Sequence, residues 1–257
     1  MKLSVVILAR NEKGNIGPAV DQIVARLLAE SIDYEILVVD DGSTDGTADE
    51  VAARSAGNER VRRVSNAAPH GFGYAVRRGL DHFTGDAVAI MMADGSDSPD
   101  DLIRYYEILR DRAECAFGTR FVPGAVVVDY PKVKLVVNRL ANTFIRLLFG
   151  FQYNDITNAF KAYRRNVIEG CRPFLSPHFN LTVELPLKAI VRGYSYDVLP
   201  ISWHQRLKGV SALRMKEMGS RYLFIVLYVW LEKMLSRGDY VRPTGERFRP
   251  WSATDAS

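Results

Sequence analysis

Cysteine is scarce in this chain of 257 residues, which contains only Cys115 and Cys171. Two cysteines this far apart give no disulfide framework and lack the paired spacing of a metal-binding cluster. We therefore expect a protein of a reducing compartment such as the cytoplasm.

Long hydrophobic runs are also missing. A membrane-spanning helix needs about 18 or more consecutive apolar residues, and no run in the sequence reaches that length. The N-terminal "MKLSVVILAR" holds a short apolar run that stops at Arg10 without a small-residue cleavage site. This segment favours a first β-strand over a signal peptide.

Excess charge is modest, because the formal net charge is only +4. A net charge this small does not indicate a nucleic-acid-binding protein. Basic residues nevertheless outnumber acidic ones between residues 200 and 249. Such a segment suits an anionic substrate or an anionic membrane surface, and it equally suits a solvated basic face.

What the sequence does contain is a regular alternation of apolar runs and amphipathic segments in its first 120 residues. Continuous apolar strands between such helices predict an α/β fold, with a mostly parallel sheet covered by helices on both faces. The strands are expected at 3–9, 34–40, 60–65, 86–93 and 114–121, and the helices at 15–30, 47–56, 71–83 and 99–111.

The second half is less regular. It predicts helices at 131–151, 179–193 and 220–237, and strands at 158–165 and 194–204. The last helix contains ten consecutive apolar residues, Tyr222–Leu231, flanked by basic residues. We expect a globular domain over residues 1–215, a membrane- or partner-associating helix over 216–238 and a polar tail over 239–257.

Polar clusters follow three of the predicted strands: "ARNE", "DDGSTDGT" and "ADGSDSPDD". Ligands of open α/β sheets bind at the carboxyl ends of the strands. Asp41 would project there, where its carboxylate can accept from the N–H groups of a nucleobase or from ribose hydroxyls. Helix capping by Ser43 or Thr44 explains the same composition without a ligand.

Taken together, "ARNE", "VVDDGSTDGT", "HGFGYAVRRGL", "MMADGSDSPDD" and "GTRF" resemble the successive motifs of the inverting family 2 glycosyltransferases. The resemblance implies the nucleotide-sugar-binding GT-A fold. In the second half, "DITNAFKAYRR", "VELPLKAIVRGY" and "PISWHQRLKGVS" are similar to dolichol- and polyprenyl-phosphate sugar transferases. The similarity extends over residues 3–216.

The resemblance also implies roles for single residues. The chain departs from the family pattern where Met92 replaces an aspartate, where Leu8 replaces a proline, and where Ala212 replaces a lysine. Asp155 matches an acid near the reacting centre, as a base or an orienting group, and a turn cap is its structural alternative. The implied nucleotide site comprises Leu8, Arg10, Glu12, Asp41, Met92, Ala93 and Asp94, and the implied phosphate site comprises Arg120, Lys134 and Arg206.

A divalent cation is expected at the same place, because a nucleoside diphosphate leaving group gains negative charge as its bond to the sugar breaks. Mg²⁺ and Mn²⁺ prefer oxygen ligands and need few from the protein. Asp94 is the predicted ligand and catalytic residue, with Ser96 as a hydroxyl or water-bridged contact and Asp97 in reserve. Residues 100 and 101 fall in the first turn of a helix and favour a structural role.

The expected reaction is inverting transfer of a hexose from GDP-mannose or a UDP-hexose to a polyprenyl or dolichyl phosphate. Two alternatives stay open: another lipid or a saccharide hydroxyl as the acceptor, or a non-catalytic nucleotide-sugar-binding protein. Segments 131–151 and 220–237 predict peripheral contact with the cytoplasmic face of a membrane. Burial in the core is an equal alternative for 131–151, and docking on a partner subunit or in a homo-oligomer is the alternative for 220–237.

Overall fold

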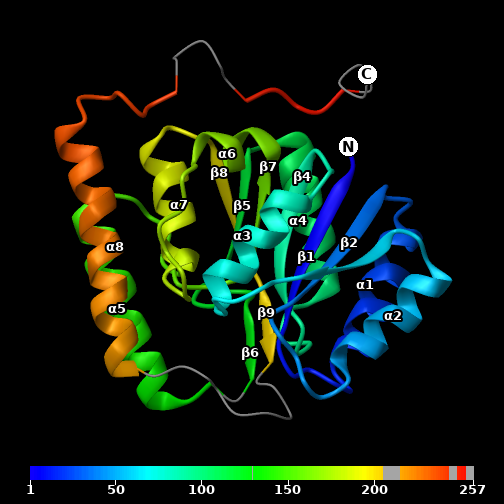
Figure 1. The fold of residues 1–257 in the computed structure, drawn as a ribbon. Coiled ribbons are helices and arrows are strands. Elements are labelled where there is room, and N and C mark those ends of the chain that lie inside the picture. The colour runs from blue at the N-terminus through cyan, green and yellow to red at the C-terminus, as the bar shows by residue number, and fades with distance from the viewer. Residues whose placement is uncertain (129, 205–214, 243–247, 253–257) are drawn as a thin grey trace.

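The computed structural model describes residues 1–128, 130–204, 215–242 and 248–252, without the side chains of residues 204 and 215–218. Its centre is a seven-stranded sheet in the order β3-β2-β1-β4-β7-β5-β8 (Figure 1). The strands of this sheet are β1 (Leu3–Ala9), β2 (Tyr34–Asp40), β3 (Val61–Ser65), β4 (Ala87–Met92), β5 (Cys115–Thr119), β7 (Lys161–Arg164) and β8 (Tyr196–Pro200).

The sheet is mostly parallel, as predicted. Strands β1, β2, β3 and β4 run in one direction, and β5 runs parallel to β8. Strand β7 is inserted between β4 and β5 and is antiparallel to both. The start of β7 therefore lies at the edge of the sheet where its two neighbours end.

Helices cover both faces because successive strand residues point to opposite sides. Residues Leu3, Val5 and Ile7 belong to one core with α1 (Ile16–Ala29), α2 (Thr47–Gly57) and α4 (Pro99–Asp111). Residues Val6 and Leu8 belong to the opposite core. The helices of that second layer are α3 (Phe72–His82), α5 (Lys132–Phe149), α6 (Arg165–Gly170), α7 (Leu181–Val191) and α8 (Met215–Leu235).

The predicted strand 194–204 is two strands. Strand β8 ends at Pro200, which has no N–H to continue a ladder, and Ile201 instead bonds Thr119 and Val126 through its main chain. The following β9 (Ser202–His204) pairs with β6 (Val126–Val128) in a separate small sheet. Elements β6 and α6 were not predicted.

Helix α8 lies on the outside of the second layer (Figure 1). Its residues Ile225, Val226 and Val229 are buried, and Arg192, the residue that follows α7, makes a bidentate ion pair with Glu232 at 2.8 and 2.9 Å. The predicted helix 220–237 thus exists but begins earlier, at Met215. No helix in the described ranges is long and apolar enough to cross a membrane.

One buried carboxylate joins three segments at the amino-terminal edge of the parallel strands. Glu35, in β2, accepts hydrogen bonds from Ser4, Thr84 and Arg62. Burial alone would raise the pKa of Glu35. The three hydrogen-bond partners lower it by more than burial raises it, so the pKa falls to about 2. The charged form therefore stabilises the fold above its ordinary pKa of 4.5, and this contribution disappears as the pH falls towards 2.

We predict that Glu35→Gln lowers the free energy of unfolding by about 1–3 kcal/mol at pH 7, since a charge-assisted network is weakened. The difference from the wild type should shrink between pH 4.5 and pH 2. Urea unfolding at several pH values measures it, with the exposed Glu107→Gln as control. An equal difference at pH 7 and pH 2.5 would contradict the assignment.

Candidate active site

The ends of β1, β2 and β4 form the first part of the site. The strand register pairs Leu8 with Met92 on one side and with Val39 on the other. The amide of Asp41 donates to the carbonyl of Ala9 at 2.9 Å. Backbone pairing thus brings Leu8, Asp41 and Met92 of the predicted nucleotide site to one edge of the sheet, and Ala93 follows Met92 directly.

The carboxylate of Asp41 is buried and held in one orientation. It accepts from Asn66 Nδ2 at 2.6 Å and from the Gly71 amide at 2.9 Å, and His70 Nδ1 lies 3.0 Å from it. The exposed Arg10 guanidinium lies 3.7 Å from Asp41 Oδ2, the oxygen that also accepts from the Gly71 amide. Sequence reasoning missed Asn66 and His70 as partners of Asp41, although both lie in the segment "NAAPH" directly before "GFG".

The loops after β1 and β2 are bonded to each other. The amide of Glu12 donates to Thr47 Oγ1 at 2.9 Å, and the amide of Thr44 donates to Asn11 Oδ1 at 2.9 Å. The Glu12 carboxylate accepts from Asn15 Nδ2 at 2.8 Å. Glu12 therefore lies beside the loop that carries Asp41, as the order of the motifs predicted.

The loop after β4 is folded around its own aspartates. Asp94 is half-buried and accepts from the Ser96 amide at 3.1 Å. Asp97 is buried and accepts from the Met92 amide at 3.0 Å. Burial raises the pKa of Asp97 to about 7, and the nearby Asp94 charge adds to the rise while the Met92 amide opposes it.

The next two acids are structural, as predicted. Asp100 is exposed and pairs with Arg26 at 2.6 Å. Asp101 is buried, accepts from the Ser202 amide at 2.7 Å and pairs with Arg104 at 3.0 Å. Their bonds attach the start of α4 to α1, through Arg26, and to β9, through Ser202. Neither partner belongs to the predicted nucleotide or metal site.

The residues after β4 fit a divalent cation of the kind that nucleotide phosphates bring with them. Asp94 offers a half-buried carboxylate at a strand end, and phosphate oxygens and water can complete an octahedron around Mg²⁺ or Mn²⁺. Asp97 is a poorer ligand near neutral pH, because its raised pKa means that a proton must leave first. The described ranges hold no group of three His, Cys, Asp or Glu side chains that could bind a metal ion by itself.

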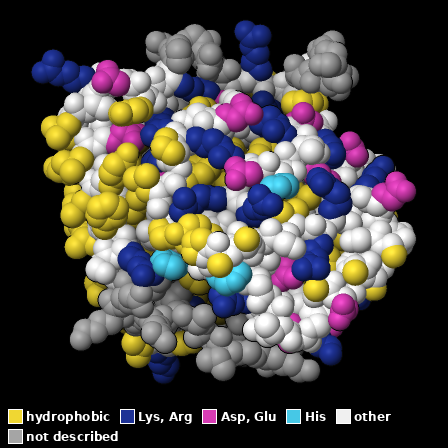
Figure 2. Space-filling view, viewed as in Figure 1, with side chains coloured by type: hydrophobic (Ala, Val, Ile, Leu, Met, Phe, Trp, Pro, Cys, Tyr) yellow, Lys and Arg dark blue, Asp and Glu magenta, His cyan; other side chains and the backbone are white. Residues whose placement is uncertain are grey.

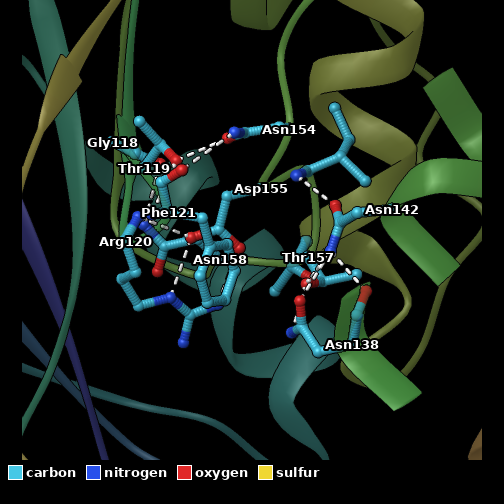
Figure 3. Close-up of polar contacts among 12 residues, drawn as sticks. Gly118, Thr119, Arg120, Phe121, Asn138, Asn142, Asn154, Asp155, Thr157 and Asn158 are labelled. Atoms are coloured by element: carbon cyan, nitrogen blue, oxygen red, sulfur yellow. Dashed lines mark hydrogen bonds and ion pairs between the residues drawn. The ribbon is translucent and has the colours of Figure 1, made fainter. Parts of the chain in front are cut away.

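The second part of the site is a buried ion pair that follows β5 (Figure 3). Arg120 donates from Nε to Asp155 Oδ2 and from its terminal nitrogen to Oδ1, both at 2.8 Å. The Arg120 amide adds a third bond to Oδ2 at 3.0 Å. Asp155 has no exposed surface. Burial lowers the pKa of Arg120, but the Asp155 charge raises it more, so the guanidinium stays charged.

Helix α5 fixes the loop that carries Asp155 (Figure 3). Asn142 Oδ1 accepts from the Ile156 amide at 2.6 Å, and both Asn142 and Asn138 donate to Thr157 Oγ1. These two asparagines were not predicted as site residues. The only sequence signal for them is their spacing of four, which places both on one face of the helix.

The predicted phosphate-binding residues come partly together. The Arg120 guanidinium lies 5.3 Å from the ring centre of Tyr130, and Lys134 Nζ lies 5.7 Å from the same ring. These two cations therefore share one aromatic neighbour at the start of α5. The third predicted residue, Arg206, lies outside the described residues, as does Ala212.

The fold matches solved glycosyltransferases of the GT-A class. Glucosyl-3-phosphoglycerate synthase from Mycobacterium tuberculosis in complex with UDP superposes with a TM-score of 0.67 at 20% identity, covering 95% of this chain and 82% of that one. The same enzyme with Mn²⁺, UDP-glucose and phosphoglyceric acid gives a TM-score of 0.65 at 20% identity, with 95% and 81% covered. This chain therefore has the GT-A fold.

The family follows from the sequence comparison. The model of glycosyl transferase family 2 matches residues 4–171, and the chain belongs to this family of glycosyltransferases. It is 36% identical to polyprenol monophosphomannose synthase of Mycolicibacterium smegmatis over 81% of this chain and 80% of that protein. It is 31% identical to dolichol-phosphate mannosyltransferase of Pyrococcus furiosus, over 84% of this chain but only 60% of the archaeal protein.

We predict that Asp94→Asn lowers kcat by about a hundredfold or more, because the variant loses the charge that would hold the cation at the leaving diphosphate. The matched Asp100→Asn should stay within twofold, since Asp100 pairs with Arg26 on the outside. Donor hydrolysis across a Mn²⁺ titration measures both. Equal losses in the two variants would contradict the assignment of Asp94.

Proposed function

We propose that this chain transfers a mannosyl group, with inversion, from GDP-mannose to a polyprenyl or dolichyl phosphate, assisted by Mg²⁺ or Mn²⁺. Support for the sugar and the acceptor comes from the names of the two similar enzymes, one a polyprenol monophosphomannose synthase and the other a dolichol-phosphate mannosyltransferase. The carboxyl-edge cluster around Asp41 suits a nucleoside, and Arg120 suits phosphate oxygens.

The bonding of Asp155 is the observation that favours a phosphate acceptor. Both of its oxygens accept from Arg120, and the carboxylate is fully buried. A general base must reach the proton that it removes, and this carboxylate is already engaged. A phosphate monoester has a second pKa near 6 and is largely ionised at neutral pH, so it needs no such base. Asp155 therefore acts as the orienting group for Arg120.

The mechanism then depends on binding and orientation by residues of this chain. The strand ends around Leu8 and Asp41 hold the nucleoside. Asp94 would hold a Mg²⁺ or Mn²⁺ ion, which when bound would supply Lewis-acid stabilisation of the leaving diphosphate. Arg120, whose Nε and one terminal N–H are bonded to Asp155, offers its remaining terminal N–H groups to phosphate oxygens. It thereby directs the acceptor oxygen to the far side of the anomeric carbon, which gives inversion.

The surface of the second helical layer supports a lipid acceptor. Apolar side chains of α5 and α8 are exposed along one side of the molecule, where Figure 2 shows hydrophobic side chains gathered. We propose that this surface rests on an anionic membrane at its cytoplasmic face. Its exposed members are Val133, Val136, Val137, Leu140, Phe144, Leu147, Leu223, Phe224, Leu227, Tyr228, Leu231, Met234 and Leu235.

We predict that the protein with Mn²⁺ forms a mannosyl lipid from GDP-mannose and a polyprenyl phosphate. The unphosphorylated polyprenol of equal chain length should give at least a hundredfold less product, because its hydroxyl requires a base that the engaged Asp155 does not provide. Thin-layer separation of radiolabelled product measures both, with UDP-glucose as the alternative donor. Transfer to the alcohol at a comparable rate would sink the proposal.

We predict that Phe224→Ser, Leu227→Ser and Leu231→Ser together abolish binding to anionic vesicles, since each removes exposed apolar area from α8. Hydrolysis of the soluble donor should be unchanged. High salt should release the parent protein only partly, because it screens charge but not apolar contact. Flotation with phosphatidylglycerol vesicles measures the binding.

A second triple variant on α5, at Val133, Leu140 and Leu147, tests whether that helix shares the contact. The most exposed of the three is Leu147, at 80%. If neither triple variant weakens flotation, the surface does not face lipid. A concentration-dependent change of mass in the parent that both variants remove would instead identify the surface as a subunit interface.

A further inference from the structure

Lys161 is a buried lysine directly beneath the Asp155 loop. It begins β7, and only 1% of its surface is exposed. Its Nζ donates to the carbonyl oxygens of Ile156 at 3.0 Å and Thr182 at 3.2 Å, and also to that of Asn158. An ammonium group has three N–H donors, so three main-chain carbonyls use its full capacity.

This arrangement differs from that of Lys188, which is also fully buried. Lys188 pairs with the Glu184 carboxylate at 2.7 Å and donates to the Pro173 carbonyl at 2.5 Å. The bonds that the structure gives Lys161 all go to neutral carbonyls. Burial lowers the pKa of Lys161 to about 7, while Asp155 raises it and Arg120 lowers it further. A buried ammonium whose bonds go to carbonyl dipoles is costly to the fold, even with the Asp155 charge nearby, which points to a role beyond packing.

The three carbonyls belong to two segments, the Asp155 loop and the start of α7. Ile156 and Asn158 follow Asp155 directly, and Thr182 lies in the first turn of α7. The segment before α7 in turn reaches the nucleoside edge, because the amide of Gly73 donates to the Pro177 carbonyl at 3.1 Å. Lys161 therefore joins the Asp155 loop to α7. The segment that precedes α7 is in turn bonded to α3 through Pro177 and Gly73.

We propose that Lys161 is a positioning residue for sugar transfer: its ammonium group holds the Asp155 loop against α7, so that Asp155 keeps the Arg120 guanidinium directed at the phosphates. The inference rests on the proposed function of that same site. Displacement of a reacting or binding group by about 1 Å can cost on the order of a hundredfold in rate. Asn142 and Asn138 hold the loop from the side of α5, and Lys161 holds the Ile156 and Asn158 carbonyls from β7.

We predict that Lys161→Met lowers kcat for transfer to polyprenyl phosphate at least tenfold, while donor hydrolysis, which uses no acceptor phosphate, stays within twofold. The Kd for GDP should stay within twofold, because β1 and β2 build the nucleoside edge without Lys161. The matched control is Lys188→Met, which removes an equally buried lysine whose bonds go to Glu184 and Pro173 and not to the Asp155 loop. We expect a similar loss of Tm in this control, with kcat within twofold of the wild type.

The pH dependence supplies a second measurement. A neutral amine keeps only two N–H donors, so one of the three carbonyls loses its partner when Lys161 releases its proton. The charged groups that act on Lys161 are Asp155 and Arg120, whereas Glu184 and Lys188 of α7 are bonded to each other. We expect kcat of the wild type to fall as the pH rises through about 7. Lys161→Arg stays charged and should lack this alkaline limb.

Three outcomes would overturn the inference. They are equal kcat losses in Lys161→Met and Lys188→Met, a weakened GDP affinity that parallels kcat, and superimposable pH profiles of the wild type and Lys161→Arg. If Lys161→Met does not fold, the pH comparison decides. The wild type separates this test from that of the proposed function. A wild type that transfers nothing to polyprenyl phosphate would defeat the proposed function, whereas equal transfer by the wild type and Lys161→Met would defeat only this inference.

Discussion

The buried ion pair between Arg120 and Asp155 is the interaction on which the second half of the site depends. Removing one partner of such a pair typically costs about 3–5 kcal/mol, because the other charge is left buried and uncompensated. The neighbouring elements keep the two partners together, because they bond the Asp155 loop from both sides, through Asn142 of α5 and through Lys161 of β7. A guanidinium held this firmly can meet a phosphate without first being ordered, which lowers the entropic cost of binding.

The antiparallel β7 explains how Asp155 reaches the same edge as Asp41 and Asp94. The register pairs Lys161 with Ile90 of β4 and with Phe117 of β5, both close to the carboxyl ends of their strands. Because β7 runs the other way, the residues that precede it emerge at that edge. A parallel strand here would have placed the Asp155 loop at the opposite edge, away from the nucleoside and the predicted cation.

The sequence predicted the elements that local pattern determines. Apolar runs located the strands of the first half to within one or two residues, and polar stretches after them located the carboxyl-edge cluster. The direction of β7 and the pairing of Arg120 with Asp155 depend on contacts between distant segments, which periodicity does not encode. Asn138 and Asn142 were missed for a related reason, since an amide on an amphipathic helix looks like any other polar position until its partner is known.

Helix α5 connects the proposed lipid-facing surface to the site. Its Asn138 and Asn142 point towards the Asp155 loop (Figure 3), while Leu140, Phe144 and Leu147 lie among its exposed apolar residues. A helix moves as a unit because its backbone bonds link every turn. Seating α5 on lipid would therefore restrict the same element that fixes the loop around Asp155. Order at the Arg120–Asp155 pair would then increase where the acceptor phosphate is present, at the membrane surface.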